Sequence, residues 1–156
     1  MEIQFRHIAR AVIVRENKLL IPQMKGVHAF LPGGGIDLGE GAQNALRREL
    51  DEELGVSCDI GRFLGVLETH RFDEQGTMHH EISHLFEVSS ALLQSHTIPR
   101  SQEEHLAFQW IELETENMKQ HRVLPPVLQD HLVNLIHNPA GVWITTFSAP
   151  NHVLLK

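Results

Sequence analysis

Three glutamates, Glu49, Glu52 and Glu53, stand at positions i, i+3 and i+4 of the chain. If this segment is helical, the spacing places all three carboxylates on one face. Like charges this close repel one another and weaken an isolated helix, whereas a bound cation would remove the repulsion. Mg²⁺ and Mn²⁺ favour such oxygen ligands. The spacing therefore predicts a metal-binding acidic face, with a solvated helix surface as the alternative.

The same segment carries a separate apolar stripe. Leu46, Leu50 and Leu54 repeat every four residues, which is the pattern of a helix that packs on one side. We expect this helix to begin near Gly41, a tolerable N-cap, and to end at Gly55 in a left-handed conformation. One face would then pack against the core while the other presents the carboxylates.

The segment from Gly34 to Val56 reads GGIDLGEGAQNALRRELDEELGV. It resembles the signature box of the Nudix hydrolases at all nine defined positions, which are Gly34, Glu40, Arg48, Glu49, Leu50, Glu52, Glu53, Gly55 and Val56. The resemblance implies a single Nudix domain over residues 1–156, with an α/β fold in which an α/β/α sandwich surrounds a central mixed β-sheet. It also implies a metal-dependent enzyme.

The resemblance gives each charged residue of the box a role. Glu49, Glu52 and Glu53 would be the ligands of Mg²⁺ or Mn²⁺, and one of them would also act as the base. Arg48 would orient a glutamate rather than contact substrate; its alternative is a surface salt bridge, worth ~0–1 kcal/mol. Glu40 would be a supporting group or peripheral ligand, or simply a carboxylate favoured by the helix macrodipole.

Two further segments complete the predicted site. Gly33, Gly34 and Gly35 permit positive φ and close approach of the backbone to a ligand, so we predict that they contact substrate. Nudix enzymes often add a carboxylate from a loop that precedes a late strand, and Glu103 and Glu104 stand in that place. We favour Glu104 as a catalytic base or extra ligand, with a pair of solvated loop charges as the alternative.

These residues predict hydrolysis of a phosphoanhydride. Such a reaction needs neutralised phosphates, an activated water and a stabilised leaving group, and bound divalent ions can serve all three. The expected substrate is a nucleoside diphosphate linked to another moiety. Nucleotide sugars, ADP-ribose, dinucleoside polyphosphates and nucleoside triphosphates all fit the box equally well.

Two other functions share the expected fold. A non-catalytic nucleotide-sensing module would be expected to lose box glutamates, and this chain keeps all of them. An isomerase acting on an isoprenoid diphosphate would need a catalytic thiol. Cys58 is the only cysteine, and we expect it to be a small buried residue instead.

Composition narrows the class of protein. A length of 156 residues suits one domain, and a net charge of −7 argues against a broad nucleic-acid-binding surface. A single cysteine forms no internal disulfide, so we expect a reducing cytoplasm. The N-terminus lacks the apolar region of a signal peptide, and no apolar run is long enough to span a membrane. The expected partner is a nucleotide-type small molecule, with a homodimer left open.

The remaining elements are predicted from apolar patterns and turn residues. Residues 8–14 and 18–24 should form a strand pair joined at Glu16-Asn17, and 30–31 a strand stub before the breaker run 32–35. Further strands are expected at 58–69 and 78–89, joined by a turn at 73–76, and at 106–113, with a helix at 124–137. Residues 143–147 could form a short strand.

The histidines and aromatic residues are weaker indicators of a functional site than the acidic segment. His79, His80 and His84 crowd one predicted strand, but no cysteine or matched ligand pair supports a zinc site, so we expect them near the cleft or at the surface. Three aromatic side chains could stack against a base, each with a place in the core or an interface as the alternative: Phe30, Phe72 and Trp143.

Overall fold

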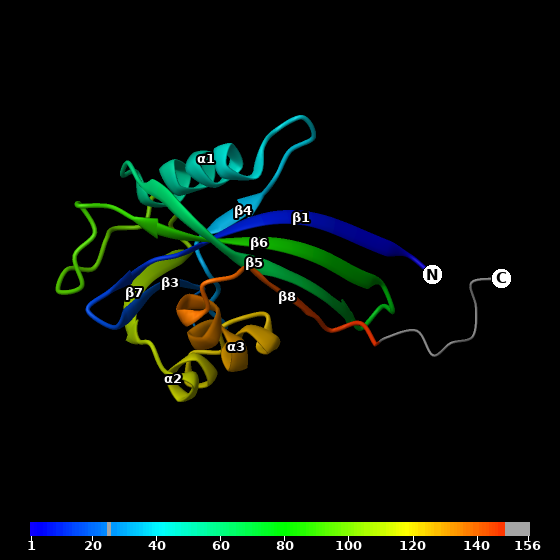
Figure 1. Cartoon of the computed structure of the whole chain (residues 1–156). Coiled ribbons are helices and arrows are strands. Elements are labelled where there is room, and N and C mark those ends of the chain that lie inside the picture. The colour runs from blue at the N-terminus through cyan, green and yellow to red at the C-terminus, as the bar shows by residue number, and fades with distance from the viewer. Residues whose placement is uncertain (25, 149–156) are drawn as a thin grey trace.

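The computed structural model describes residues 1–24 and 26–148. A large sheet lies between α1 (Ala42–Leu54) on one face and α2 (Thr115–Gln120) with α3 (Pro126–His137) on the other (Figure 1). The predicted α/β/α sandwich is therefore confirmed. The predicted domain also includes residues 25 and 149–156, which lie outside the described residues. No helix in the described part of the chain is long and apolar enough to cross a membrane.

The large sheet is mixed, in strand order β4-β1-β6-β5-β8. β1 runs parallel to β6, β6 runs antiparallel to β5, and β5 runs parallel to β8. The strand bounds are Ile3–Val12 for β1, Gly33–Gly35 for β4, Asp59–Phe72 for β5, Met78–Ser89 for β6 and Val142–Thr145 for β8. The predicted strand at 78–89 thus has the expected bounds, and the segment left open near Trp143 is β8.

A second sheet contains β2 (Val14–Arg15), β3 (Lys18–Met24) and β7 (Leu106–Glu112). The predicted pairing of residues 8–14 with 18–24 is wrong in its extent, because only β2 pairs with β3. The preceding residues belong to β1 in the large sheet. The predicted turn is confirmed: Glu16 (φ 49°) and Asn17 (φ 60°) are both left-handed, as a two-residue hairpin requires.

The glycine run was expected to interrupt secondary structure, but Gly33–Gly35 forms β4, antiparallel to β1. The strand stub expected at residues 30–31 is absent from the assigned strands. Side-chain preferences gave no signal for β4, because its residues have no side chains. Gly33 has φ 131°, and a Cβ there would lie 2.1 Å from the carbonyl oxygen of Ala9. Only glycine can bring this strand so close to β1.

Two apolar clusters hold the helices to the sheet. On one side α1 inserts Leu46 and Leu50, both fully buried, against Ala9 and Ala11 of β1. On the other side Leu128 and Leu132 of α3 belong to a cluster that extends over β3, β5 and β6. Full burial of one leucine stabilises a fold by ~1.5–3 kcal/mol, so each helix is firmly anchored. The helix α2 was not predicted from the sequence.

Candidate active site

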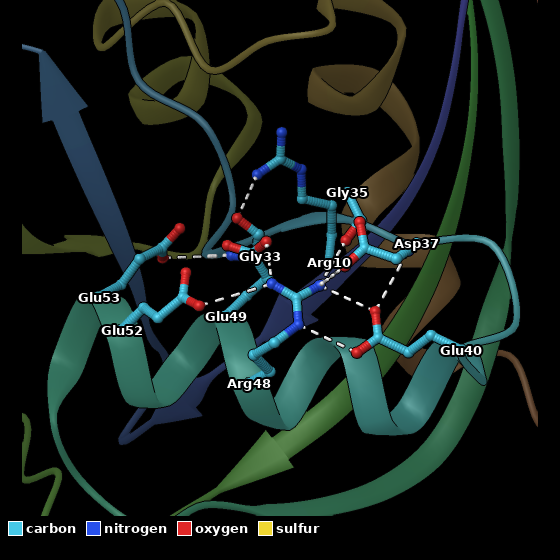
Figure 2. A network of polar contacts seen from close by, with 9 residues as sticks. All are labelled: Arg10, Gly33, Gly35, Asp37, Glu40, Arg48, Glu49, Glu52 and Glu53. Carbon is cyan, nitrogen blue, oxygen red and sulfur yellow. Dashed lines mark hydrogen bonds and ion pairs between the residues drawn. The ribbon is translucent and has the colours of Figure 1, made fainter.

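Arg48, in the middle of α1, is the centre of a polar network (Figure 2). Its Nε and Nη2 donate to the two carboxylate oxygens of Glu40 at 3.0 and 2.8 Å. Its Nη1 donates to Glu49 Oε1 at 3.0 Å, and Nη2 also donates to the carbonyl of Gly35 at 3.0 Å. These hydrogen bonds hold the pKa of Glu40 near 2. The geometry matches the expected orienting role of Arg48 and makes Glu40 its main partner.

Two more carboxylates lie farther from the same guanidinium. Glu52 Oε1 is 3.6 Å from Arg48 Nη1, and Asp37 Oδ2 is 3.7 Å from Nη2. The Glu52 side chain is 55% exposed. Glu52 is therefore the most loosely held of the three predicted metal ligands.

Glu53 lies at the buried end of the acidic face. Gly33 donates its backbone N–H to Glu53 Oε2 at 3.2 Å. Burial raises the pKa of Glu53 to about 8, although the Gly33 hydrogen bond and the charge of Arg10 both oppose the increase. A divalent cation would supply the positive charge that this buried carboxylate needs.

Glu49 reaches the cleft because Gly34 has no side chain. A Cβ at Gly34 would lie 2.4 Å from Glu49 Cδ, much closer than any real contact. The Glu49 carboxylate therefore lies directly against β4 and reaches the edge of the sheet. Gly33, Gly34, Gly35 and Glu49 all line one cleft of about 870 Å³. The predicted glycines thus belong to the candidate substrate site, although their contact with substrate stays a prediction.

The floor of this cleft is the face of the large sheet opposite to α1. Strands β1, β5 and β6 supply it, and the segments around Phe30 and Pro125 form its walls. Three arginines line it, Arg6, Arg10 and Arg71. None of the three is among the site residues predicted from the sequence. Arg6 and Arg10 share one face of β1 by the period-two rule, which was a usable signal, whereas Arg71 comes from a strand far along the chain.

Among the three arginines of the cleft, Arg10 is the one whose charge acts on Glu53. Its Nη1 donates to the carbonyls of Leu31 and Gly33 at 3.0 and 3.1 Å. Its guanidinium carbon lies 5.4 Å from the centre of the Phe30 ring, within the range of a cation–π contact. Burial lowers the pKa of Arg10, but an arginine stays charged under all ordinary conditions. The charge therefore remains available to an anion in the cleft.

The loop before β7 contacts the end of α1. Gln102 donates its N–H to the carbonyl of Glu53 at 2.9 Å. The charge of Glu103 contributes to the raised pKa of Glu53. Glu104, which the sequence favoured, is exposed in the same loop. The effect of its charge on Glu53 and its lower exposure thus favour Glu103 over Glu104, and a catalytic role for either one stays a prediction.

Within the described residues, no three His, Cys, Asp or Glu side chains converge closely enough to hold a metal ion. Arg48 instead lies between the side chains of Glu49 and Glu52. The donor set still fits a hard divalent cation, because it offers three carboxylates and one of them is buried and raised in pKa. Glu49, Glu52 and Glu53 would hold that cation.

The other candidates from the sequence fall into two groups. Phe30 and His79 line the cleft, and His79 Nε2 lies 2.9 Å from Asp73 Oδ2. The remaining aromatic and histidine candidates lie outside the cleft lining: His80, His84, Phe72 and Trp143. Burial raises the pKa of the Cys58 thiol to about 11, so this thiol is a poor nucleophile and gives no support to an isomerase.

Comparison with known proteins agrees with this geometry. A search of curated proteins finds no match. Among solved structures, the MutT NUDIX hydrolase from Burkholderia pseudomallei is 24% identical, with a TM-score of 0.63, over 81% of this chain and 95% of that one. The E. coli ORF135 protein is 25% identical, with a TM-score of 0.62, over 88% of this chain and 96% of that one. A UDP-X diphosphatase is 18% identical, with a TM-score of 0.64, over 90% and 67%.

The family model for the NUDIX domain matches residues 5–130, which include the whole box, most of β1 and the floor of the cleft. The match extends well beyond the acidic helix from which the resemblance was first drawn. This chain therefore belongs to the Nudix family and is a pyrophosphohydrolase that acts on phosphoanhydride bonds.

Proposed function

We propose that the protein cleaves the pyrophosphate bond of a nucleoside diphosphate linked to another moiety, with Mg²⁺ or Mn²⁺ as cofactor. One observation carries this proposal: the cleft joins the carboxylate of Glu49 to the guanidinium groups of three arginines. Arg6 is paired with Glu81 of the same lining at 3.1 Å, so Arg10 and Arg71 supply the positive charge that a substrate can use in a protein of net charge −7. This charge suits an anionic substrate that approaches a metal held by glutamates.

Each part of the site has a task in this proposal. Glu49, Glu52 and Glu53 hold the metal, which would neutralise phosphate oxygens and lower the pKa of a bound water. Arg48 keeps Glu49 in place through its 3.0 Å hydrogen bond. Arg10 and Arg71 hold the anionic part of the substrate farther along the cleft. Gly33, Gly34 and Gly35 let the backbone approach the phosphates.

The attached base has one candidate stacking residue in the cleft. Of the three aromatic residues considered from the sequence, Phe30 alone lines the cleft. Its ring already contacts the guanidinium of Arg10, so a base on its free face would extend an existing stack. This supports a nucleotide substrate rather than an aliphatic diphosphate. A cytoplasmic location remains part of the proposal.

The test is a panel of nucleotide sugars, ADP-ribose, dinucleoside polyphosphates and nucleoside triphosphates, with products separated by chromatography. Turnover should require Mg²⁺ or Mn²⁺ and stop with EDTA. Cleavage of an isoprenoid diphosphate alone would overturn the nucleotide assignment. Tight nucleotide binding with no turnover in any metal would instead favour the non-catalytic sensing module.

A further inference from the structure

The N-terminal half of β1 is an open edge of the large sheet. β6 pairs with β1 along its whole length, but β4 covers only Ile8–Arg10 on the other side. The last hydrogen bond on that side runs from the Ile36 N–H to the His7 carbonyl at 2.8 Å. Among the described residues, no strand pairs with Ile3–Arg6 at this edge, and Figure 1 shows this part of β1 extending beyond β4. Such edges are templates for pairing with another strand.

The backbone groups of this edge point outward at alternate residues. The Met78 N–H donates to the Glu2 carbonyl at 2.9 Å, which shows that even-numbered residues bond toward β6. The hydrogen bond to His7 shows that odd-numbered residues bond toward the β4 side. The N–H and C=O groups of Ile3 and Phe5 therefore face the open edge. An added strand would find both donors and acceptors there.

The side chains of the edge are apolar on one face and charged on the other. Ile3 is 55% exposed and Phe5 is 57% exposed, although Phe5 packs edge-on against His80. Glu2, Gln4 and Arg6 point to the opposite face by the period-two rule. The stretch Ile3–His7 contains no proline, lysine or register shift, which are common devices that protect an edge strand.

The edge is complementary to a second copy of itself. In an antiparallel pair centred on Gln4, Glu2 lies opposite Arg6 of the second copy, and Ile3 lies opposite Phe5 of the second copy. Arg6 is 53% exposed and uses one N–H for Glu81 at 3.1 Å, so other N–H groups remain for Glu2. Centring the pair on Phe5 would place Glu2 opposite Ile8, where β4 already lies.

We propose that two copies of this chain associate through this edge, with their β1 strands antiparallel and centred on Gln4. The two large sheets become one continuous sheet across the interface. Two Glu2–Arg6 ion pairs lie on one face, and Ile3 and Phe5 of both copies form an apolar stripe on the other. Because the contact is a short strand pair, the interface is small, and the fraction of dimer should depend on protein concentration.

Disulfide trapping tests the register. In full-length protein with Cys58→Ala, Gln4→Cys places two cysteines at a non-hydrogen-bonded pair, where the Cα atoms lie ~4.5 Å apart. That separation permits a disulfide, so mild oxidation should give a covalent dimer. Arg6→Cys is the control, because its two copies would lie about 13 Å apart along the strands and cannot be bridged. Efficient trapping through Arg6→Cys but not Gln4→Cys would overturn the register.

Sedimentation velocity over a range of concentrations tests the association itself. Phe5→Lys should raise the dimer dissociation constant about tenfold or more, because it places a lysine on the edge. Phe72→Lys is the matched control: it is an exposed phenylalanine of the same sheet, but it lies on β5, away from the edge. A dimer that Phe5→Lys leaves intact would show another interface and overturn the proposal. The proposal is also overturned if the protein is monomeric at every concentration and no disulfide-linked dimer is trapped. The open edge of β1 would then be free to pair with a strand from a different protein.

Discussion

Arg48 and Arg10 lie on either side of the same glutamates but in opposite electrostatic settings. Four carboxylates lie within 4 Å of Arg48, those of Asp37, Glu40, Glu49 and Glu52. Arg10 instead donates to two backbone carbonyls and lies over the ring of Phe30. Arg48 is paired with carboxylates on several sides. Among the described residues Arg10 has no carboxylate within 4 Å, and the charges of Glu53, Glu81 and Glu49 act on it only from farther away.

This difference separates structural charge from charge that can bind a ligand. An arginine surrounded by carboxylates organises them and has little attraction left for a phosphate. An arginine that donates to neutral carbonyls is held in place and still attracts an anion. In the proposed function, the acidic face of α1 binds the metal and the arginines on the floor of the cleft bind the substrate. The predictions below test that division.

The largest effect is expected on the acidic side. Glu52→Gln and Glu53→Gln should each lower kcat by about a hundredfold or more, because each removes a charge from the metal-binding set. Circular dichroism should show an intact fold, since the size of the side chain is kept. Turnover close to wild type in both variants would show that the acidic face is not the catalytic one.

Metal should stabilise the protein in a pH-dependent way. The pKa of Glu53 rises from 4.5 to about 8 on folding, so the folded state binds this proton more tightly than the unfolded chain. In EDTA, the stability that the protonated Glu53 contributes is fully present below about pH 4.5. It is lost as the pH rises toward about 8 and this carboxyl ionises. Above that range, Mg²⁺ at a hundredfold excess over Kd should restore ~2.7 kcal/mol.

Urea unfolding with Mg²⁺, Mn²⁺ and EDTA, at about pH 5 and about pH 8.5, measures this coupling. The gain from metal should be larger at the higher pH, and Glu53→Gln should reduce it. Identical unfolding midpoints in all three solutions would argue that these carboxylates bind no metal.

Gly34 lies between the acidic helix α1 and the cleft, and its neighbour Gly35 provides a matched control. Gly34→Ala should lower kcat/KM about tenfold or more, because its Cβ would displace the Glu49 carboxylate, 2.4 Å away. Gly35→Ala has no protein atom within 4 Å of its new Cβ, so it leaves Glu49 in place and should lower kcat/KM less than Gly34→Ala does. Steady-state kinetics of both proteins make the comparison, and equal losses would point to the strand as a whole.

On the basic side the effect should be smaller and should appear in KM. Arg71→Gln removes one charge from the cleft lining and should raise KM about fivefold, or ~1 kcal/mol, with kcat nearly unchanged. Arg47→Gln is the control, since Arg47 is exposed on α1 and is not among the residues that line the cleft. A drop in kcat without a change in KM would place Arg71 on the catalytic side of the division.

The smallest effect concerns the loop before β7. Glu103→Gln should lower kcat a few-fold, because the charge of Glu103 acts on Glu53, whereas Glu104→Gln should have less effect. Both variants should keep the stability of the wild type in thermal melts. Should Glu104→Gln be the damaging change, the assignment made from the sequence is the better one.

The acidic side of the site could be predicted from sequence because it lies within one continuous segment. Helical spacing places Glu49, Glu52 and Glu53 on one face, and Gly55 ends the helix with φ 65°, as expected. The basic side could not be found in this way. Arg10 and Arg71 come from strands that meet only in the folded sheet, and no local pattern connects them.

The misplaced elements have physical reasons as well. β4 consists of glycine and carries no side-chain preference, so it was read as an interruption. The helix α2 has six residues and buries only Met118, too little for a helical period to be visible. The choice between Glu103 and Glu104 depends on the path of a loop that has no period at all.

Gly34 lies in β4, at the border of the large sheet, with Glu49 of α1 on one side and the cleft on the other. This arrangement has a consequence for redesign. The carboxylates that we propose as metal ligands belong to α1, which packs on one face of the large sheet, and the floor of the cleft is the other face. Substitutions of floor residues such as Thr69 and Ser83 therefore leave the core under α1 unchanged. An engineer could vary which group the enzyme accepts while keeping its reaction. The same separation offers evolution a route to new substrates while the acidic helix α1 stays unaltered.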